Sequence, residues 1–167
     1  MSKSADEEGR LPMFSCAKLL PVLMTVLALV CPVSAAENDT EVKVRALVEN
    51  AVEMFKSKGM QAALKAINDR NGPFVKGDLY VFALTMDNTL VGQPHEHTLR
   101  NMNLNNIKDN NGLLLFQKFT EVVSGKGEGW VEYLWAKPGA KVASRKKSFV
   151  KKIPNEGLYA GAGYYLD

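Results

Sequence analysis

The chain has 167 residues, enough for one domain with a full hydrophobic core and too few for two of ordinary size. Its hydrophobic content of 46% and charged content of 23% are ordinary for a globular protein and exclude disorder throughout. The net charge is only +3, and the one dense group of cations, between Arg145 and Lys152, divides between the two faces of a strand. The composition therefore argues against nucleic-acid binding.

The first 35 residues have the pattern of a secretory signal peptide. Lys18 precedes an apolar run from Leu19 to Val30, and small residues follow at Ser34 and Ala35, as they do at a cleavage site. The run is shorter than the roughly 20 residues that a membrane span needs. We expect cleavage after Ala35 and a periplasmic or secreted mature protein, with an uncleaved N-terminal membrane anchor as the alternative.

Two helices are predicted at the start of the mature chain. Asn38 and Glu41 are spaced as in a capping box, and apolar residues then recur at helical spacing, which predicts an amphipathic helix over residues 40–58. Gly59 is a natural stop for this helix, and a second, shorter helix is expected over about 60–68.

The middle of the chain predicts a hairpin, a long loop and a third helix. Residues 79–84 are apolar on both sides, with Tyr80 and Phe82 on one of them, which predicts a buried central strand followed by a short return strand. The polar, asparagine-rich stretch 92–106 is expected to be an ordered loop of the kind that often lines a functional site. Helical spacing resumes over 113–124.

Three strands are predicted to complete the chain, at about 129–136, 143–152 and 158–165, separated by turns that contain proline and glycine. The order of elements predicts an α+β fold, with an antiparallel sheet of about five strands, a long N-terminal helix and further helices packed on the sheet. Tyr133 and Trp135 are two residues apart and therefore share one face of this sheet.

Four segments in the C-terminal third carry a resemblance to a known family. They are Gly127 to Gly129, Trp135-Ala-Lys-Pro-Gly139, Lys146-Lys-Ser-Phe-Val150, and the glycine-rich strand from Gly161 that closes on Tyr165-Leu-Asp167. In this order and spacing they resemble the single Cache domain of type 2, a PAS-like extracytoplasmic sensor domain of bacterial chemoreceptors and kinases. The resemblance covers residues 37–167 and implies a PAS-like Cache fold that binds a small molecule.

Two features depart from the family pattern. The family usually shows a His-Pro pair followed by Gly-Lys-Asn, whereas this chain has Gln93-Pro94, displaced histidines at 95 and 97, and Asn101-Met102-Asn103. The polar groups of this loop are changed, so ligand identity is not carried over from the relatives. Family members also usually continue into a membrane helix and a signalling domain. This sequence stops at Asp167, so a stand-alone secreted form with a membrane receptor or kinase as partner is expected.

The resemblance implies a small polar metabolite, such as a short carboxylate, held between the sheet and the elements packed on it. The candidate ligand-binding residues are Tyr80, Phe82, Arg100, Tyr133, Trp135 and Lys146. The aromatic residues would form apolar walls, and Arg100, Lys146 or the adjacent Lys147 would supply a cation for a carboxylate. The alternative is structural: the aromatic residues pack the core, and the cations are solvated.

The sequence gives little support to metal binding or catalysis. His95 and His97 could share an ion, but both cysteines (16 and 31) lie in the leader, and incidental histidines of a surface loop are the favoured interpretation. No serine lies in a nucleophile motif, and Glu128 and Glu132 would stand roughly 13 Å apart on a strand, too far for glycoside hydrolysis. We expect no metal, no cofactor and no enzymatic activity.

The prediction is an extracytoplasmic sensory or accessory protein that binds a small polar or carboxylate metabolite reversibly. The alternative is a structural or protein-interaction module whose pocket is vestigial and which dimerises through the helix over 40–58. The equivalent helix often forms a dimer interface in receptors of the family, so the resemblance also implies a homodimer.

Overall fold

The computed structural model describes residues 38–166, and the predicted signal peptide over residues 1–35 lies outside this range. The described chain contains helices α1 (Asp39–Ile67) and α2 (Leu115–Lys126) and a short 3₁₀ helix, η1 (His97–Leu99). Its strands are β1 (Val75–Lys76), β2 (Leu79–Thr85), β3 (Leu90–Gly92), β4 (Glu128–Ala136), β5 (Ala143–Ile153) and β6 (Leu158–Tyr165).

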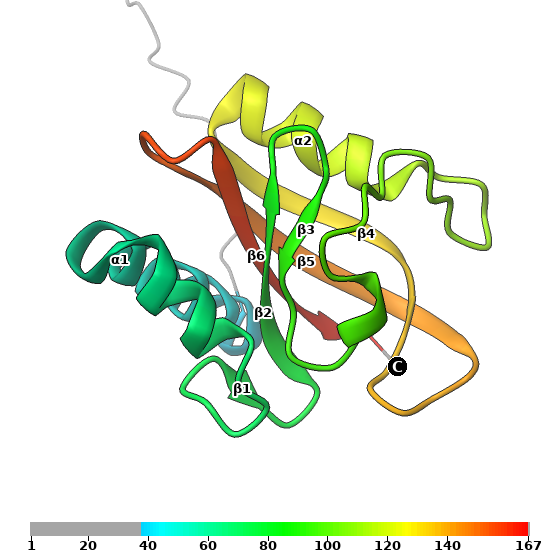
Figure 1. Cartoon of the computed structure of the whole chain (residues 1–167). Coiled ribbons are helices and arrows are strands. Elements are labelled where there is room, and N and C mark those ends of the chain that lie inside the picture. Colours follow the sequence, from blue (N-terminus) through cyan, green and yellow to red (C-terminus); the bar gives the residue numbers. More distant parts are fainter. Residues whose placement is uncertain (1–37, 167) are drawn as a thin grey trace, which may run out of the picture. The chain divides into compact units, whose positions relative to one another are not determined.

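The strands form one antiparallel sheet in the order β1-β2-β6-β5-β4, and β3 also pairs with β2. The C-terminal strand β6 therefore lies in the middle of the sheet (Figure 1). The α+β fold with a long N-terminal helix is confirmed. The described chain has six strands rather than about five, because β1 has only two residues and is too short to show an alternating pattern.

Helices α1 and α2 pack against opposite faces of the sheet (Figure 1). Successive side chains of a strand point to opposite faces, and in β2 Val81 and Ala83 pack toward α1. Tyr80, Phe82 and Leu84 pack toward α2. The prediction that β2 is buried on both faces is confirmed.

Helix α1 begins and bends where the sequence predicts. The Asn38 side chain accepts a hydrogen bond from the Glu41 backbone N–H at 2.9 Å, and the Glu41 carboxylate accepts one from the Asn38 N–H at 3.3 Å, which completes the capping box. Gly59 has a φ of 79°, which interrupts the helix between the two predicted segments. The buried residues of α1 recur at helical spacing (Val44, Val48, Ala51, Val52 and Phe55).

A glycine in β6 makes room for an aromatic ring of β2. Gly161 pairs with Phe82, and a Cβ atom at Gly161 would lie 2.5 Å from Cζ of the Phe82 ring. Any larger residue at this position would push the ring away from β6. The absence of a side chain at Gly161 therefore allows Phe82 to lie across the sheet on the face that α2 covers.

Candidate ligand-binding site

A cavity lies between α2, the loop that follows β3, and the sheet face that carries Tyr80 and Phe82. It is lined by eleven residues: Tyr80, Phe82, Leu90, Gln93, Leu99, Leu104, Leu115, Phe116, Phe119, Tyr133 and Trp135. Its free volume is about 30 Å³. A buried water needs about 10–15 Å³ of such space, so the cavity has room for two or three waters or for a small organic molecule.

The aromatic walls of the cavity hold one another in place. The Phe82 and Phe119 rings stack with centroids 5.6 Å apart, and Phe119 also meets the Tyr133 ring edge-to-face at 5.2 Å. Phe116 meets Trp135 at 5.9 Å with the two rings perpendicular. These are favourable aromatic geometries, and they keep the walls apart without filling the space between them.

The hydroxyl of Tyr133 is already satisfied within the protein. Tyr133 Oη lies 2.9 Å from Oγ of the buried Ser148, and either atom can be the donor. Burial raises the pKa of Tyr133 above its usual range, so its phenol is neutral. Tyr133 therefore offers the cavity a ring surface rather than a free polar group.

Lys146 is buried beside the cavity without a hydrogen-bond partner. Lys146 is only 1% exposed, and its Nζ has no hydrogen-bond acceptor in the described chain. Nζ lies 4.0 Å from the centroid of the Tyr80 ring and 4.9 Å from that of Tyr165. Burial lowers the pKa of Lys146 to about 7, and the negative charge of Asp78 opposes this shift only weakly. An unpaired cation at this depth is a candidate partner for an anion.

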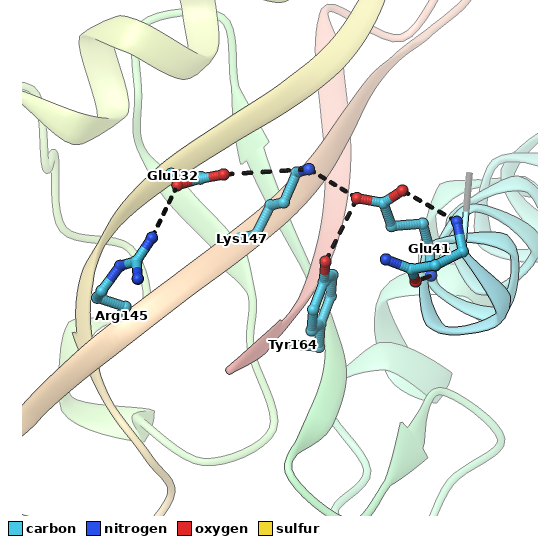
Figure 2. Close-up of polar contacts among 6 residues, drawn as sticks. Glu41, Glu132, Arg145, Lys147 and Tyr164 are labelled. Atoms are coloured by element: carbon cyan, nitrogen blue, oxygen red, sulfur yellow. Dashed lines mark hydrogen bonds and ion pairs between the residues drawn. The ribbon is translucent and has the colours of Figure 1, made fainter. Parts of the chain in front are cut away.

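Lys147, the next residue of β5, lies in a different environment. Its Nζ donates to Glu41 Oε1 at 2.6 Å, and the Tyr164 hydroxyl donates to the same oxygen at 3.3 Å (Figure 2). Glu132 lies 4.0 Å from Nζ on the other side and also pairs with Arg145 (Figure 2). Lys147 therefore anchors the start of α1 to the sheet, which leaves Lys146 as the lysine beside the cavity.

The loop that follows β3 is held by the C-terminal end of α1. The Asn68 side chain accepts a hydrogen bond from the Gln93 N–H at 2.9 Å, and Arg70 donates to the backbone oxygens of Pro94 and His95 at 3.0 and 3.1 Å. Gln93 Oε1 in turn accepts from the N–H groups of His95 and Glu96. These bonds place the His95 ring against Tyr80, edge-to-face with centroids 4.9 Å apart.

The two loop histidines are not equivalent. Nε2 of His95 is buried without a hydrogen-bond partner in the described chain, and burial together with the charge of Arg70 lowers the pKa of this ring. His97 is exposed, and its Nε2 accepts a hydrogen bond from Arg70 Nε at 3.0 Å. Among residues 38–166, no three His, Cys, Asp or Glu side chains gather as a metal site would require.

The structure gathers five of the six candidate residues around the cavity. Tyr80, Phe82, Tyr133 and Trp135 line it, and Lys146 lies against Tyr80. Arg100 is half-buried and is not one of the lining residues.

Sequence reasoning did not single out the remaining lining residues or His95. Phe116 and Phe119 lie in the helix predicted over 113–124, and their spacing is that of residues on its buried face, but this spacing does not distinguish a cavity wall from an ordinary core. Gln93, Leu99 and Leu104 belong to the loop that was expected to line a site, but a loop has no period that shows which residues point inward. His95 was weighed only as a metal ligand, and nothing in the sequence marked its contact with Tyr80.

This combination of a central antiparallel sheet, a long N-terminal helix and a cavity beneath a loop is that of a PAS-like sensor domain. The family model described as the Cache domain matches residues 32–167. The chain therefore belongs to the Cache domain family, as its C-terminal motifs predicted.

The solved structures and curated proteins that are similar to this chain include sensor domains of chemotaxis proteins. A periplasmic sensor domain of a chemotaxis protein is 35% identical with a TM-score of 0.68, and the match covers 77% of this chain and 96% of that one. A Cache chemosensory domain solved to explain carboxylic acid recognition is 26% identical with a TM-score of 0.67, covering 77% of this chain and 94% of that one. Methyl-accepting chemotaxis protein McpP of Pseudomonas putida is 27% identical over 90 residues, which are 54% of this chain and 16% of that protein.

These relatives are sensory proteins of chemotaxis, and Cache domains are extracytoplasmic. This chain spans only about a sixth of the length of the curated chemotaxis protein. Over residues 38–166, neither helix combines the length and the apolar character that a membrane crossing requires.

Proposed function

We propose that this protein is a sensory or accessory binding protein that takes up a small carboxylic acid reversibly, with the carboxylate at Lys146 and the hydrocarbon part in the aromatic cavity. The solved relative that recognises carboxylic acids supports this class of ligand. The buried ammonium of Lys146 is the observation that carries the proposal.

A buried ammonium without an acceptor is unfavourable because it loses its hydration and gains no hydrogen bond in return. The rings of Tyr80 and Tyr165 lie within cation–π distance of Nζ, but such contacts contribute only about 0.5–2 kcal/mol. A carboxylate placed beside Nζ would supply both the missing acceptor and the opposite charge. Residues 38–166 provide no hydrogen-bond acceptor for Nζ, carboxylates included, so we assign the role to the ligand.

The cavity restricts the size of the acid. Its 30 Å³ suits a molecule of a few non-hydrogen atoms, which corresponds to an acid of about two or three carbons. A longer acid would have to displace Phe116, Phe119 or Trp135, whose rings pack against one another and against the strands. Acetate and propionate are therefore the first ligands to test.

The test is isothermal titration calorimetry of the protein with acetate, propionate and hexanoate, together with propionamide as the uncharged counterpart of propionate. We expect propionate to bind, propionamide to bind at least tenfold more weakly because it lacks the charge, and hexanoate to bind poorly. Lys146→Met should abolish propionate binding. Lys152→Met, at an exposed position of the same strand, should leave it unchanged.

A folded protein that binds none of these acids would overturn the proposal and favour an interaction module whose cavity is closed by its own side chains. Equal affinity for propionate and propionamide would also contradict it, because the ammonium would then play no part in binding.

A further inference from the structure

We propose that the carboxylate is held between Lys146 and His95, and that it enters the site together with one proton taken from the solvent. This inference rests on the proposed function and adds to it a second binding residue and a dependence on pH. It starts from the polar atoms that the fold leaves unsatisfied.

In the described part of the chain, two side-chain nitrogens are buried without a hydrogen-bond partner: Lys146 Nζ and His95 Nε2. They come from distant segments, β5 and the loop after β3, and yet both side chains contact the same ring, that of Tyr80. Buried polar atoms are nearly always satisfied in native proteins. The two side chains that carry these unsatisfied nitrogens pack against one ring, and that ring lines the cavity. We take this as the sign of a shared acceptor that the ligand supplies.

A carboxylate is the acceptor that fits both nitrogens. It has two oxygens, so one can accept from the Lys146 ammonium while the other accepts from the Nε2–H of a neutral His95 ring. His95 needs no second charge for this role. The charge of Lys146 and the charge of Arg70 both disfavour protonation of His95, and only Glu96 and Asp78 oppose them.

The backbone around His95 is fixed before any ligand arrives. Gln93 Oε1 accepts from the His95 N–H, and Arg70 donates to the His95 carbonyl oxygen at 3.1 Å. Both peptide groups of His95 are thus tied to neighbouring side chains, which holds the ring on Tyr80. A donor that is already in position loses little conformational freedom when the ligand binds.

The proton balance follows from the surroundings of Lys146. The groups around it are Asp78 from the turn before β2, Tyr80 from β2, Tyr133 from β4, Tyr165 from β6 and His95 from the loop. Glu96, also in the loop, acts electrostatically on the neighbouring Tyr80 and His95. Burial outweighs the charge of Asp78, so the free protein holds Lys146 with a pKa of about 7. A bound carboxylate raises this pKa because it favours the ammonium form. Above pH 7, the amine therefore gains one proton from solvent for each carboxylate bound.

The experiment is calorimetry with propionate at pH 6, 7, 8 and 9, each in two buffers that differ in ionisation enthalpy. The difference in observed heat between the buffers gives the number of protons taken up. We expect uptake near zero at pH 6, about one half at pH 7 and close to one at pH 8 and 9. The dissociation constant should rise about tenfold per pH unit above pH 7.

Variants at His95 test the second contact. His95→Phe keeps a ring against Tyr80 but removes the donor, and it should weaken propionate binding about tenfold. His95→Gln keeps a donor and should restore most of the affinity, which a merely structural role would not predict. His97→Gln is the matched control at an exposed neighbour and should bind like the wild type.

The outcomes separate this inference from the proposed function. Absence of binding at every pH would refute the proposed function itself. Binding with equal affinity at pH 6 and pH 9 and no proton uptake would overturn the inference while the proposed function stands. Wild-type affinity in the folded His95→Phe variant would remove His95 from the site.

Discussion

The Lys146 side chain destabilises the ligand-free protein and is also the cation of the proposed binding site. Its ammonium loses hydration on folding, and among residues 38–166 it finds rings but no acceptor. Binding sites commonly contain groups that are unfavourable in the free protein because they are positioned for a ligand. The free energy that Lys146 costs the empty protein should therefore be measurable as a dependence of stability on pH.

We predict that the free protein becomes more stable as the pH rises from 7 to about 10. The unfolded chain keeps Lys146 protonated up to its ordinary pKa of 10.5, whereas the folded chain releases this proton near pH 7. The unfolded state therefore binds more protons between these values, so the free energy of unfolding rises with pH across this window. Urea unfolding at pH 6, 7, 8 and 9 measures this slope.

The same reasoning predicts that Lys146→Met stabilises the ligand-free protein. Methionine fills a similar volume without a charge to desolvate, so the free energy of unfolding at pH 7 should rise by on the order of 2 kcal/mol. The variant should also lose the contribution of this residue to the pH dependence. A destabilised variant at pH 7 would show that Lys146 is paired in solution and would contradict the structure of its surroundings.

The sequence predicts which side chains share a face of a strand, but not which of them are buried by other strands. Alternation along the strands placed Tyr80 beside Phe82, and Tyr133 beside Trp135, because the side-chain period of a strand is fixed at two. It could not show that Lys146 is buried, since burial depends on Tyr80 and Tyr165, which belong to other strands. The different surroundings of Lys146 and Lys147 became visible only once the neighbours of β5 were known.

At the scale of single elements, α1 is attached to the sheet near its first turn by a partly buried ion pair. Glu41 accepts hydrogen bonds from Lys147, Tyr164 and the N–H of Asn38, and its side chain is only 11% exposed. The hydrogen bond from Lys147 is the main cause that lowers the pKa of Glu41. Farther along α1, Glu49 reaches Lys151 at 3.5 Å, but its side chain is 48% exposed.

We predict that Glu41→Gln lowers the free energy of unfolding by about 1–2 kcal/mol at pH 7, because several charge-assisted hydrogen bonds are weakened together. Glu49→Gln, the matched control, should change it by less than about 0.5 kcal/mol. The folded-state pKa of Glu41 lies below its ordinary value of 4.5. The ionised Glu41 therefore stabilises the fold fully above pH 4.5, and this stabilisation is lost as the pH falls through the folded-state pKa. Urea unfolding at pH 7 and pH 3 checks both statements, and equal effects of the two variants would contradict the first.

Element boundaries were predicted well where a chemical signal marks them. The capping box at Asn38 and the positive φ of Gly59 place the start and the bend of α1 as the sequence indicated. Helix α2 begins at Leu115 rather than at residue 113, because the two residues before it belong to the preceding turn. The backbone N–H and C=O of Leu113 both bond to Asp109, and Leu114 forms an isolated bridge with Lys108. Strand β1 was missed because its pairing with β2 depends on the turn at Gly77, whose φ is 63°, and not on a pattern of its own.

At the scale of the described domain, the layer of α1 and the cavity lie on opposite faces of the sheet, but they are connected around its edge. The loop after β3 leaves the α1 side, where Asn68 holds it, and continues to the cavity, which Gln93, Leu99 and Leu104 line. The sequence identified the family and the fold from motifs in β4, β5 and β6. This connection could not be predicted, because it depends on hydrogen bonds between segments that are 25 residues apart.

The connection leads to a prediction about a residue that does not line the cavity. Asn68→Ala removes the acceptor for the Gln93 N–H at 2.9 Å and the donor to the Val91 carbonyl at 3.4 Å, so the segment 91–97 should become more mobile. Gln93 and His95 then have to be ordered when the ligand binds, and we expect propionate affinity to fall about fivefold, which is about 1 kcal/mol. Amide hydrogen exchange over 91–97 should accelerate in the same variant.

Asn50→Ala, at an exposed position of α1, is the control and should change neither the affinity for propionate nor the exchange rate. Unchanged affinity in Asn68→Ala, despite faster exchange, would show that the ligand is recognised without the loop and by the sheet and α2 alone.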